Sequence, residues 1–372
     1  MLGQWIGRFE ATYSKGDITI EIDKLKEGGG GRVYLFSDDP QQGAMVGYFE
    51  APNPRSPVQC KVELNPVDPA TMTVVPWQDI PRVFPGQQFA KVAKASFRWA
   101  RNSMTVTWTA DNGNGGKATL TKRDATRQSE LPAKNLEWAD FKAHVAAQAE
   151  HHRRYVFRGQ REPWRLRTTF HRSGRSDLIR YTSVDMTLLH QRLSARTRHY
   201  FNRKNSDENG AFMHLAQHHG FPTPLLDWSY SPFVACFFAY QKITNKEAEK
   251  SKRRSVRVLQ FDREQWMKDF PQLPWVAPTR PHFSLLEFVA IENERLIPQQ
   301  ALSGLTNVDD VESYIQSCES LTGRSYLTAI DLPVAERESV MKELALMGIT
   351  AGSLFPGLDG TCEELRERLF PS

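Results

Sequence analysis

Residues 217–240 read QHHGFPTPLLDWSYSPFVACFFAY, and this stretch decides how the second half of the chain folds. Before it, apolar residues at helical spacing predict a helix over residues 207–219, and Gly220 is suited to end that helix. The prolines of FPTPLLDW forbid helix and predict an extended, preshaped loop. Ser231 and Pro232 then predict the cap and the first residue of a second helix, which is apolar nearly all round and therefore central.

The polar residues of this stretch are candidates for a site. Asp227 and Trp228 are expected on the rigid loop between the two helices, where the carboxylate can orient His219, Arg158 or a ligand hydroxyl. Gln217 and the histidines occupy the last helical turn, whose free carbonyls favour a protonated imidazole. Taken one at a time, each of these residues is better interpreted as a helix cap or as part of the core. Taken together, the group favours a binding or catalytic site. Adjacent histidines point to different faces of a helix, so no metal site is predicted.

The segment from Arg153 to Lys204 is strongly basic. It holds thirteen arginines and one lysine against three acids, a formal charge of +11 where the whole chain carries +5. Charge so unevenly distributed predicts a polyanionic partner, whether nucleic acid, the phosphates of a nucleotide or an acidic surface. Arginine in place of lysine favours bidentate contacts with phosphate or carboxylate. Internal pairing with acids of the carboxy-terminal half stays open as the alternative, and these acids include Glu292, Glu294, Asp309 and Asp310.

Within this segment the sequence YVFRGQ, which ends at Gln160, predicts a buried strand that delivers Arg158 to the rim of a cleft. A structural salt bridge of this arginine is equally consistent with so short a motif. Gly159 permits a sharp turn or the close approach of a ligand. A second polar cluster, TTFHR, contributes His171 and Arg172 from the neighbouring strand or loop. For a site to form, Arg158 must meet the carboxylate that precedes Trp228 at one concave, water-accessible place.

The first third of the chain alternates apolar and polar residues with a period of two. The turn DNGNGG lies between two such runs and predicts a hairpin. We expect five or more antiparallel strands in a small sandwich or barrel over residues 1–125. The glycines at 28–31 lack the lysine and the serine or threonine of a phosphate-binding loop. We therefore expect this domain to recognise a protein partner or a trigger, or to shield the second domain, and not to carry out chemistry.

Residues 126–135 are charge-rich and are interpreted as a linker to a second domain over residues 136–372, which opens with a helix; the predicted class is α+β. A length of 372 residues with 40% hydrophobic and 24% charged side chains fits two soluble globular domains. Four scattered cysteines without a CxxC pair predict neither a disulfide framework nor a structural zinc site. The first ten residues do not resemble a signal peptide, and no apolar run approaches the roughly 20 residues of a membrane span, so we expect a cytoplasmic protein without a membrane partner.

Three motifs together resemble the FRG domain family, which is named for its Phe-Arg-Gly motif. They are YVFRGQ, the stretch at residues 217–240, and GITAGSLFPGLDG at residues 348–360. The resemblance runs from about Trp138 to Phe370 and implies a mixed α+β FRG domain. Many members read PTRLLDW where this chain has Pro224, so a basic residue is absent from the loop. Some members resemble components of bacterial defence against phage, which implies an antiviral toxin.

Phe157-Arg158-Gly159 is also similar to the arginine and glycine that end the first core strand of enzymes that transfer ADP-ribose from NAD. This likeness implies an NAD cofactor, with Arg158 holding phosphate or ribose. It also implies a late glutamate or glutamine that holds a ribose hydroxyl beside the developing cation. The segment 283–300 offers Glu294 and Gln299 after residues 288–291, which have the composition of a strand.

Two functions are therefore carried forward. The first is an NAD- or nucleotide-using transferase or glycohydrolase whose catalytic candidates are Arg158, His219, Asp227, Glu294 and Gln299. Its candidate ligand contacts are Arg158, Gly159, Gln160, His171, Arg172, Gln217, His218 and Trp228. The second is a nucleic-acid-binding module in which the arginines contact phosphates and nothing is transferred. Nuclease activity is less favoured because the sequence has no compact set of acids and histidines at metal-ligand spacing.

Overall fold

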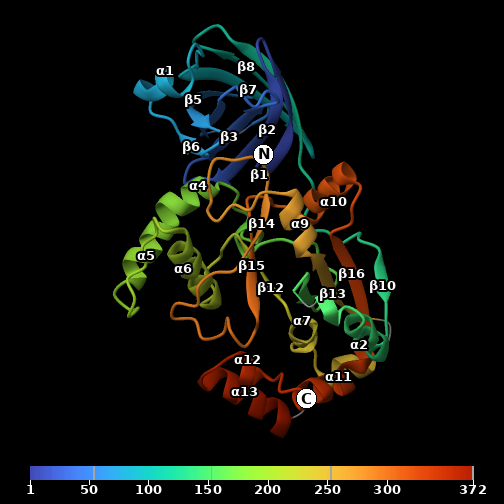
Figure 1. Cartoon of the computed structure of the whole chain (residues 1–372). Helices are drawn as coiled ribbons and strands as arrows, with labels where there is room; N and C mark the ends of the chain where they lie inside the picture. Colours follow the sequence, from blue (N-terminus) through green and yellow to red (C-terminus); the bar gives the residue numbers. More distant parts are fainter. Residues whose placement is uncertain (53–54, 152, 252–253, 371–372) are drawn as a thin grey trace.

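The computed structural model describes residues 1–52, 55–151, 153–251 and 254–370, and it contains two sheets that each have their own core. Figure 1 shows the first sheet, in blue and teal, at one end of the molecule beside α4 (Leu178–Arg180), and the carboxy-terminal helices at the other end. The α+β class expected from the sequence is confirmed.

The first sheet is a closed antiparallel barrel, so of the two predicted arrangements the barrel is observed. Its strands are β1 (Gly3–Ala11), β2 (Lys15–Lys24), β3 (Gly29–Ser37), β4 (Ala44–Ala51), β5 (Val58–Asp68), β7 (Val92–Ala100), β8 (Ser103–Ala110) and β9 (Gly115–Thr121), with β6 (Thr73–Val74) added at β5. They pair in the order β4-β3-β2-β1-β9-β8-β7-β5, and β4 also pairs with β5, which closes the ring. The predicted hairpin is confirmed, since β8 and β9 are joined through DNGNGG with Gly113 at positive φ.

The second sheet is mixed, in the order β10-β16-β13-β11-β12-β15-β14. The strands are β10 (Ala133–Asn135), β11 (Tyr155–Gln160), β12 (Leu225–Ser229), β13 (Ser255–Asp262), β14 (Phe283–Leu286), β15 (Ala301–Thr306) and β16 (Leu327–Pro333). The parallel pair is β10 with β16, and the other neighbours are antiparallel. The end of the expected linker is therefore not structureless, because residues 133–135 form the edge strand of this sheet.

Helices cover the second sheet, and the short helices α1 (Ile80–Val83) and α4 lie near the barrel. The bounds of the others are α2 (Trp138–Ala146), α3 (Thr169–Arg172), α5 (Met186–Leu193), α6 (Ser206–His218), α7 (Pro232–Tyr240), α8 (Asn245–Lys250), α9 (Arg263–Asp269), α10 (Val311–Thr322), α11 (Arg337–Leu346), α12 (Ala351–Leu354) and α13 (Leu358–Leu369). The expected opening helix is α2, which buries Trp138 and Phe141. As predicted, α7 is central, and its cap Ser231 accepts a hydrogen bond from the Val234 N–H.

Three local predictions differ from the structure. TTFHR, expected on a strand or loop, forms the short helix α3 over Thr169–Arg172. FPTPLLDW is extended, but its second half is a paired strand, β12. Both prolines precede the residues Leu225–Ser229 that pair with β15, so neither has to donate to the ladder. Residues 288–291 are not a strand; the strand is Phe283–Leu286, which pairs with β15. Phe288 instead packs against α6, where a Cβ on Gly210 would lie 2.1 Å from the phenylalanine ring.

The barrel docks on the second domain through buried charges. Asp23 on β2 accepts hydrogen bonds from the Arg175 Nε and from the Ser176 N–H, both at 2.6 Å. Arg32 on β3 pairs with Asp177 at 2.9 Å. Because Asp23 and Asp177 are both buried, these contacts hold the two domains together and do not belong to a solvated surface.

Candidate functional site

Arg158 and Asp227, 69 positions apart in the chain, meet at one cleft. They lie on neighbouring strands of the second sheet, β11 and β12, where Phe157 is paired with Ser229. The Arg158 guanidinium donates a hydrogen bond from Nη1 to the main-chain carbonyl oxygen of Asp227. The cleft beside them has a volume of about 880 Å³. The convergence that a site requires is therefore present in the fold.

Gly159 explains how β11 and α7 come close enough to form the floor of this cleft. A Cβ on Gly159 would lie 1.8 Å from the Ala235 carbonyl oxygen on α7. The sequence suggested a sharp turn or the close approach of a ligand at this glycine, whereas the structure shows a continuous strand that a helix backbone approaches. The absent side chain therefore serves helix packing.

Asp227 is held by two neighbours from α6. Gln217 donates from Nε2 to Asp227 Oδ1 at 2.6 Å, and His214 Nε2 lies 3.3 Å from the same oxygen. Burial by itself raises the pKa of Asp227, but His214, Arg158 and His218 outweigh it and lower the pKa to about 2. The side chain is still 46% exposed, on the cleft side. Asp227 is thus an ionised carboxylate that is fixed from behind and open in front.

A chain of hydrogen bonds orients the histidines behind this carboxylate. His218 Nδ1 lies 2.7 Å from Asn293 Oδ1, and Asn293 Nδ2 lies 3.1 Å from His214 Nδ1. An amide oxygen only accepts and an amide nitrogen only donates, so His218 carries its proton on Nδ1 while His214 Nδ1 accepts. His214 Nε2 then faces Asp227 Oδ1 at 3.3 Å. Burial, with His214 nearby, lowers the pKa of His218 to about 4, so that it is neutral at physiological pH.

Cationic side chains line the same cleft without carboxylate partners. Among the described residues, Arg158, Arg172, Arg295 and Lys242 form no ion pair with an acid, although all four border the cleft. Burial lowers the pKa of Arg158 and of Arg172. The Nε of Arg158 is buried and has no hydrogen-bond partner in the part of the chain that the structure describes, and the same holds for the Oε1 of Gln160 beside it. Buried polar atoms are normally bonded to protein or water, so these two atoms are available to a ligand or to water in the cleft.

Aromatic rings complete the walls. Trp164 stands at the cleft and is 45% exposed. Phe238 and Phe355 meet edge to face at 5.9 Å between ring centroids, and the Arg295 guanidinium lies 5.5 Å from the centre of the Phe355 ring. These surfaces suit the flat face of a ring held next to anionic groups.

The remaining sequence candidates divide into two groups. Gln217, Trp228, His218 and Gln299 border the cleft with Arg158 and Asp227. Gln299 is largely buried and donates from Nε2 to the Leu354 carbonyl at 2.9 Å, which ties it to the third FRG motif. The structure does not bring His219, Glu294 or His171 to the cleft. His219 is exposed at the end of α6, and Glu294 is exposed in a loop. His171 is fully buried, with its Nδ1 2.8 Å from the Thr168 hydroxyl.

The basic segment is partly used inside the protein. Six of its thirteen arginines pair with carboxylates, namely Arg153, Arg154, Arg161, Arg165, Arg167 and Arg175. Arg165 pairs with Asp310 and Arg167 with Asp309, two of the carboxy-terminal acids named as internal partners. Internal pairing therefore accounts for about half of the positive charge, and the cleft holds two of the arginines that are left.

Sequence reasoning missed several cleft residues. His214 and Asn293 act from behind Asp227, while Arg295, Lys242 and Phe355 border the cleft. His214 lies four residues before His218 on α6, so the helical repeat was a usable signal. Phe355 lies in the motif at residues 348–360, but its place at the cleft follows from the tertiary structure, and no local pattern marks Asn293, Arg295 or Lys242.

Comparisons with known proteins identify part of the chain. Residues 153–248 match the family model for the FRG domain, and this range contains both Arg158 and Asp227. The FRG resemblance is thereby confirmed over residues 153–248, which contain two of the three motifs; its extension to Phe370 stays a prediction. No curated protein matches the chain. Among solved structures, a de novo designed, fluorescence-activating beta barrel is similar at 16% identity with a TM-score of 0.23, over 33% of this chain and 94% of that one.

Two further observations concern metals and membranes. Over the residues that the structure describes, no three histidine, cysteine, aspartate or glutamate side chains are grouped so as to hold a metal ion. In the same part of the chain, none of the helices has both the length and the apolar character that crossing a bilayer requires.

Proposed function

We propose, from the premise that residues 153–248 form an FRG domain, that this chain is an enzyme that binds NAD or a related nucleotide and breaks its glycosidic bond. The observation that carries the proposal is the cleft in which an ionised Asp227 faces arginines that have no acid partner among the described residues. A dinucleotide has the complementary chemistry: a diphosphate, a ribose that becomes cationic, and flat rings.

The arginines supply the phosphate contacts in this proposal. Arg158 is anchored through one Nη to the sheet, so that its other N–H groups are free to donate to a phosphate. Arg172 enters from α3 and Arg295 from the loop that follows β14. A diphosphate would restore the hydrogen bonding that the buried Arg158 Nε lacks. The rings of Trp164 and Phe355 offer surfaces against which a base can stack.

Asp227 supplies the electrostatic contribution. In hydrolysis, the bond between C1′ of the ribose and the nicotinamide nitrogen breaks, and its electron pair leaves with nicotinamide. Water then bonds to C1′ and releases one proton, which yields ADP-ribose; in transfer, a nucleophilic acceptor replaces the water. Positive charge develops on the ribose, and a fixed carboxylate stabilises it. With its pKa near 2, Asp227 is charged at every physiological pH and suits this role better than that of a proton acceptor.

This assignment revises the sequence hypothesis in one respect. Glu294 was the candidate for stabilising the cation, but it is exposed and does not border the cleft. Gln299 borders it, yet its amide is bonded to the Leu354 carbonyl. Asp227 is the carboxylate that residues of α6 hold in position, so we assign to it the stabilisation of the cation. His219 is exposed and does not border the cleft, so no role is assigned to it.

Incubation of the purified chain with NAD tests the proposal. Chromatography of the products should show nicotinamide and ADP-ribose in equal amounts in water alone. When candidate protein or nucleic-acid acceptors are added, nicotinamide should exceed free ADP-ribose if transfer occurs. A folded protein that leaves NAD and related nucleotides intact under all these conditions would rule out the enzyme.

A second function is favoured by a separate observation, the exposed arginines around α5. Arg192, Arg196 and Arg198 are exposed and form no ion pair with an acid among the described residues, and Tyr200 beside them is 72% exposed. Such a surface can contact nucleic-acid phosphates, with an aromatic ring available for stacking. If it does, the affinity for single-stranded nucleic acid should fall steeply as the salt concentration rises. Changing the three arginines to alanine should reduce the slope of log binding constant against log salt concentration. NAD cleavage should survive those changes.

A further inference from the structure

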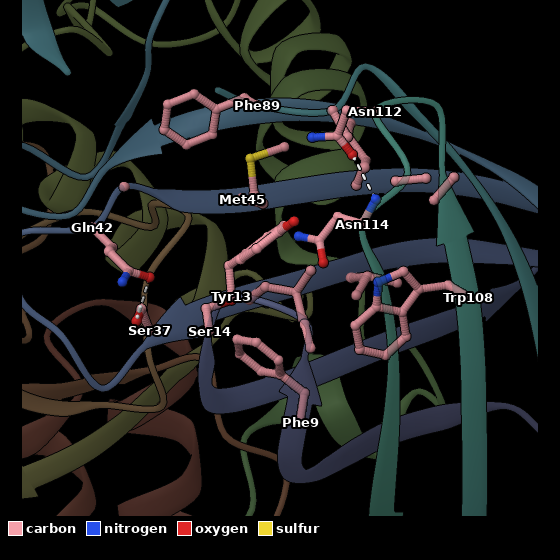
Figure 2. A pocket seen from close by; sticks show the side chains of 18 of the residues that line it. Phe9, Tyr13, Ser14, Ser37, Gln42, Met45, Phe89, Trp108, Asn112 and Asn114 are labelled. Atoms are coloured by element: carbon pink, nitrogen blue, oxygen red, sulfur yellow. Dashed lines mark hydrogen bonds between the residues drawn. The ribbon is translucent and has the colours of Figure 1, made fainter. Parts of the chain in front are cut away.

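The barrel contains a pocket that is separate from the cleft described above. Its volume is about 660 Å³, and the residues that line it fall between Phe9 and Asn114, all within the amino-terminal domain. Figure 2 shows Tyr13, Met45, Trp108 and Asn114 arranged around this space. An eight-stranded barrel is wide enough either to be filled by its own side chains or to hold one small ligand.

One end of this barrel is filled and the other is open. At the filled end the core consists of large buried residues that do not border the pocket, namely Trp5, Ile20, Phe49, Met104 and Leu120. At the open end the inward positions of β7 and β8 carry small residues, Ala93, Ala95 and Ala110, with Ala11 on β1. The alternation of each strand aims these alanines inward, so the space is built into the sequence.

The walls are apolar and rich in aromatic rings. Phe9, Phe89, Phe97 and Trp108 border the pocket, and Phe9 and Trp108 lie 6.3 Å apart in a tilted arrangement. Of the described residues that line the pocket, Asp39 is the one that carries a charge, and its carboxylate already accepts from the Gln41 N–H at 3.0 Å. These lining residues include no lysine or arginine, so phosphates and other anions find no counter-charge among them.

One polar atom at the mouth has no partner within the described part of the chain. The Oδ1 of Asn114 is buried and accepts no hydrogen bond from the described residues, whereas the nearby side chains of Asn112 and Gln87 are bonded. Asn112 Oδ1 accepts from the Asn114 N–H at 3.1 Å, and Gln87 bonds both the Gly43 N–H and the Gln41 carbonyl. An acceptor left free beside an apolar cavity is satisfied by a donor on a ligand or by water, and a ligand that supplies the donor gains a hydrogen bond.

We infer that the barrel binds one small, neutral, largely aromatic molecule that donates a hydrogen bond to Asn114. The pocket size is typical of small-molecule sites, and the aromatic walls favour a flat ring. The barrel is then the ligand-recognising domain of the chain, and its ligand differs in charge from whatever occupies the cleft of the second domain. This inference does not depend on the proposed enzyme activity.

Titration of the full chain with Nile red, a neutral aromatic dye, tests the site. Fluorescence should rise to a stoichiometry of one dye per chain, and saturating dye should raise the unfolding temperature. Ala110→Phe fills the pocket mouth and should weaken binding at least about ten-fold. Thr109→Phe adds the same ring one position away on the outer face and should bind like the unchanged protein.

A second pocket variant and a competition experiment complete the test. If Ala110→Phe does not fold by circular dichroism, Ala11→Phe narrows the same mouth from β1. Competition by 2-naphthol and by 2-methoxynaphthalene, which lacks the donor, examines Asn114: the naphthol should compete about three- to ten-fold better, and Asn114→Ala should abolish that preference. Absence of dye binding, or equal binding by both phenylalanine variants, would overturn the site; an unchanged preference in Asn114→Ala would overturn the role of Asn114.

Discussion

Arg158 donates its hydrogen bond to the main-chain carbonyl of Asp227 and not to the Asp227 carboxylate. The carboxylate instead accepts a hydrogen bond from Gln217 and lies 3.3 Å from His214 Nε2, and both residues belong to α6. The two charges are therefore fixed side by side without neutralising each other through a direct ion pair. A cleft with a separately anchored cation and anion suits a ligand that has both an anionic group and a centre that becomes positive.

Replacing Asp227 by asparagine should lower the turnover of NAD by about 100- to 1,000-fold, since the side chain keeps its shape but loses the charge that faces the developing cation. Asp359→Asn is the matched control, because Asp359 is an exposed acid that borders the same cleft. It should change turnover by less than about three-fold. Equal losses in both variants would mean that overall charge matters and not the position of Asp227.

Gly159→Ala should destabilise the second domain by at least about 1–3 kcal/mol, because the new Cβ would lie 1.8 Å from the Ala235 carbonyl oxygen. Gly115→Ala provides a control in the barrel, where the nearest atom would be 3.4 Å away. Urea unfolding curves of the two variants measure the difference. Similar stabilities would show that α7 does not pack on β11 as closely as described.

Removing the carboxylate that docks the barrel should cost far more than removing an exposed one. Asp23→Ala leaves the Arg175 Nε and two backbone N–H groups without their acceptor, while Arg175 keeps its pair with Asp185, and should lower the free energy of unfolding by about 2–4 kcal/mol. Asp17→Ala breaks ion pairs with Arg8 and Arg280 whose side chains are about half exposed, and should cost less than about 1 kcal/mol. A small effect of Asp23→Ala in thermal unfolding would contradict the buried docking contacts.

Acid should destabilise the protein through its buried histidines. Burial lowers the pKa of His171 to about 4 from an unfolded value near 6.5. The unfolded chain therefore binds the proton first, and stability that is fully present above about pH 6.5 is lost as pH falls toward 4. For His171 alone the loss amounts to about 3 kcal/mol. His171→Gln should flatten the stability profile between pH 6.5 and 4 relative to pH 8, and an unchanged slope would contradict the assignment.

The sequence predicts the elements of the site better than their arrangement. The strand at YVFRGQ and the helices on either side of FPTPLLDW follow from local spacing, capping and proline positions, and all are observed. Whether the first sheet closes depends on the pairing of β4 with β5, which alternation alone does not specify. The choice between His218 and His219 depends on where the last turn of α6 ends, and a shift of one residue changes the face.

Contacts between residues from distant segments could not be predicted from local sequence patterns. Phe355 belongs to a motif that the sequence marks, but its contact with Arg295 forms only when the tertiary structure brings the two together. The barrel pocket likewise follows from alanines on different strands that face one interior. Such features require the pairing register, because each strand separately shows only alternation.

The measurement that tests the central claim most directly is the affinity of the chain for ADP-ribose, determined by calorimetry for the unchanged protein, Arg158→Lys and Arg154→Lys. Arg158 borders the cleft, whereas Arg154 pairs with Asp262 at 2.6 Å outside it. We expect one binding site, a loss of about ten-fold or more in Arg158→Lys, and no more than about a two-fold change in Arg154→Lys. The absence of ADP-ribose binding, or an affinity that the two substitutions change equally, would contradict the claim that Arg158 and Asp227 form a nucleotide site.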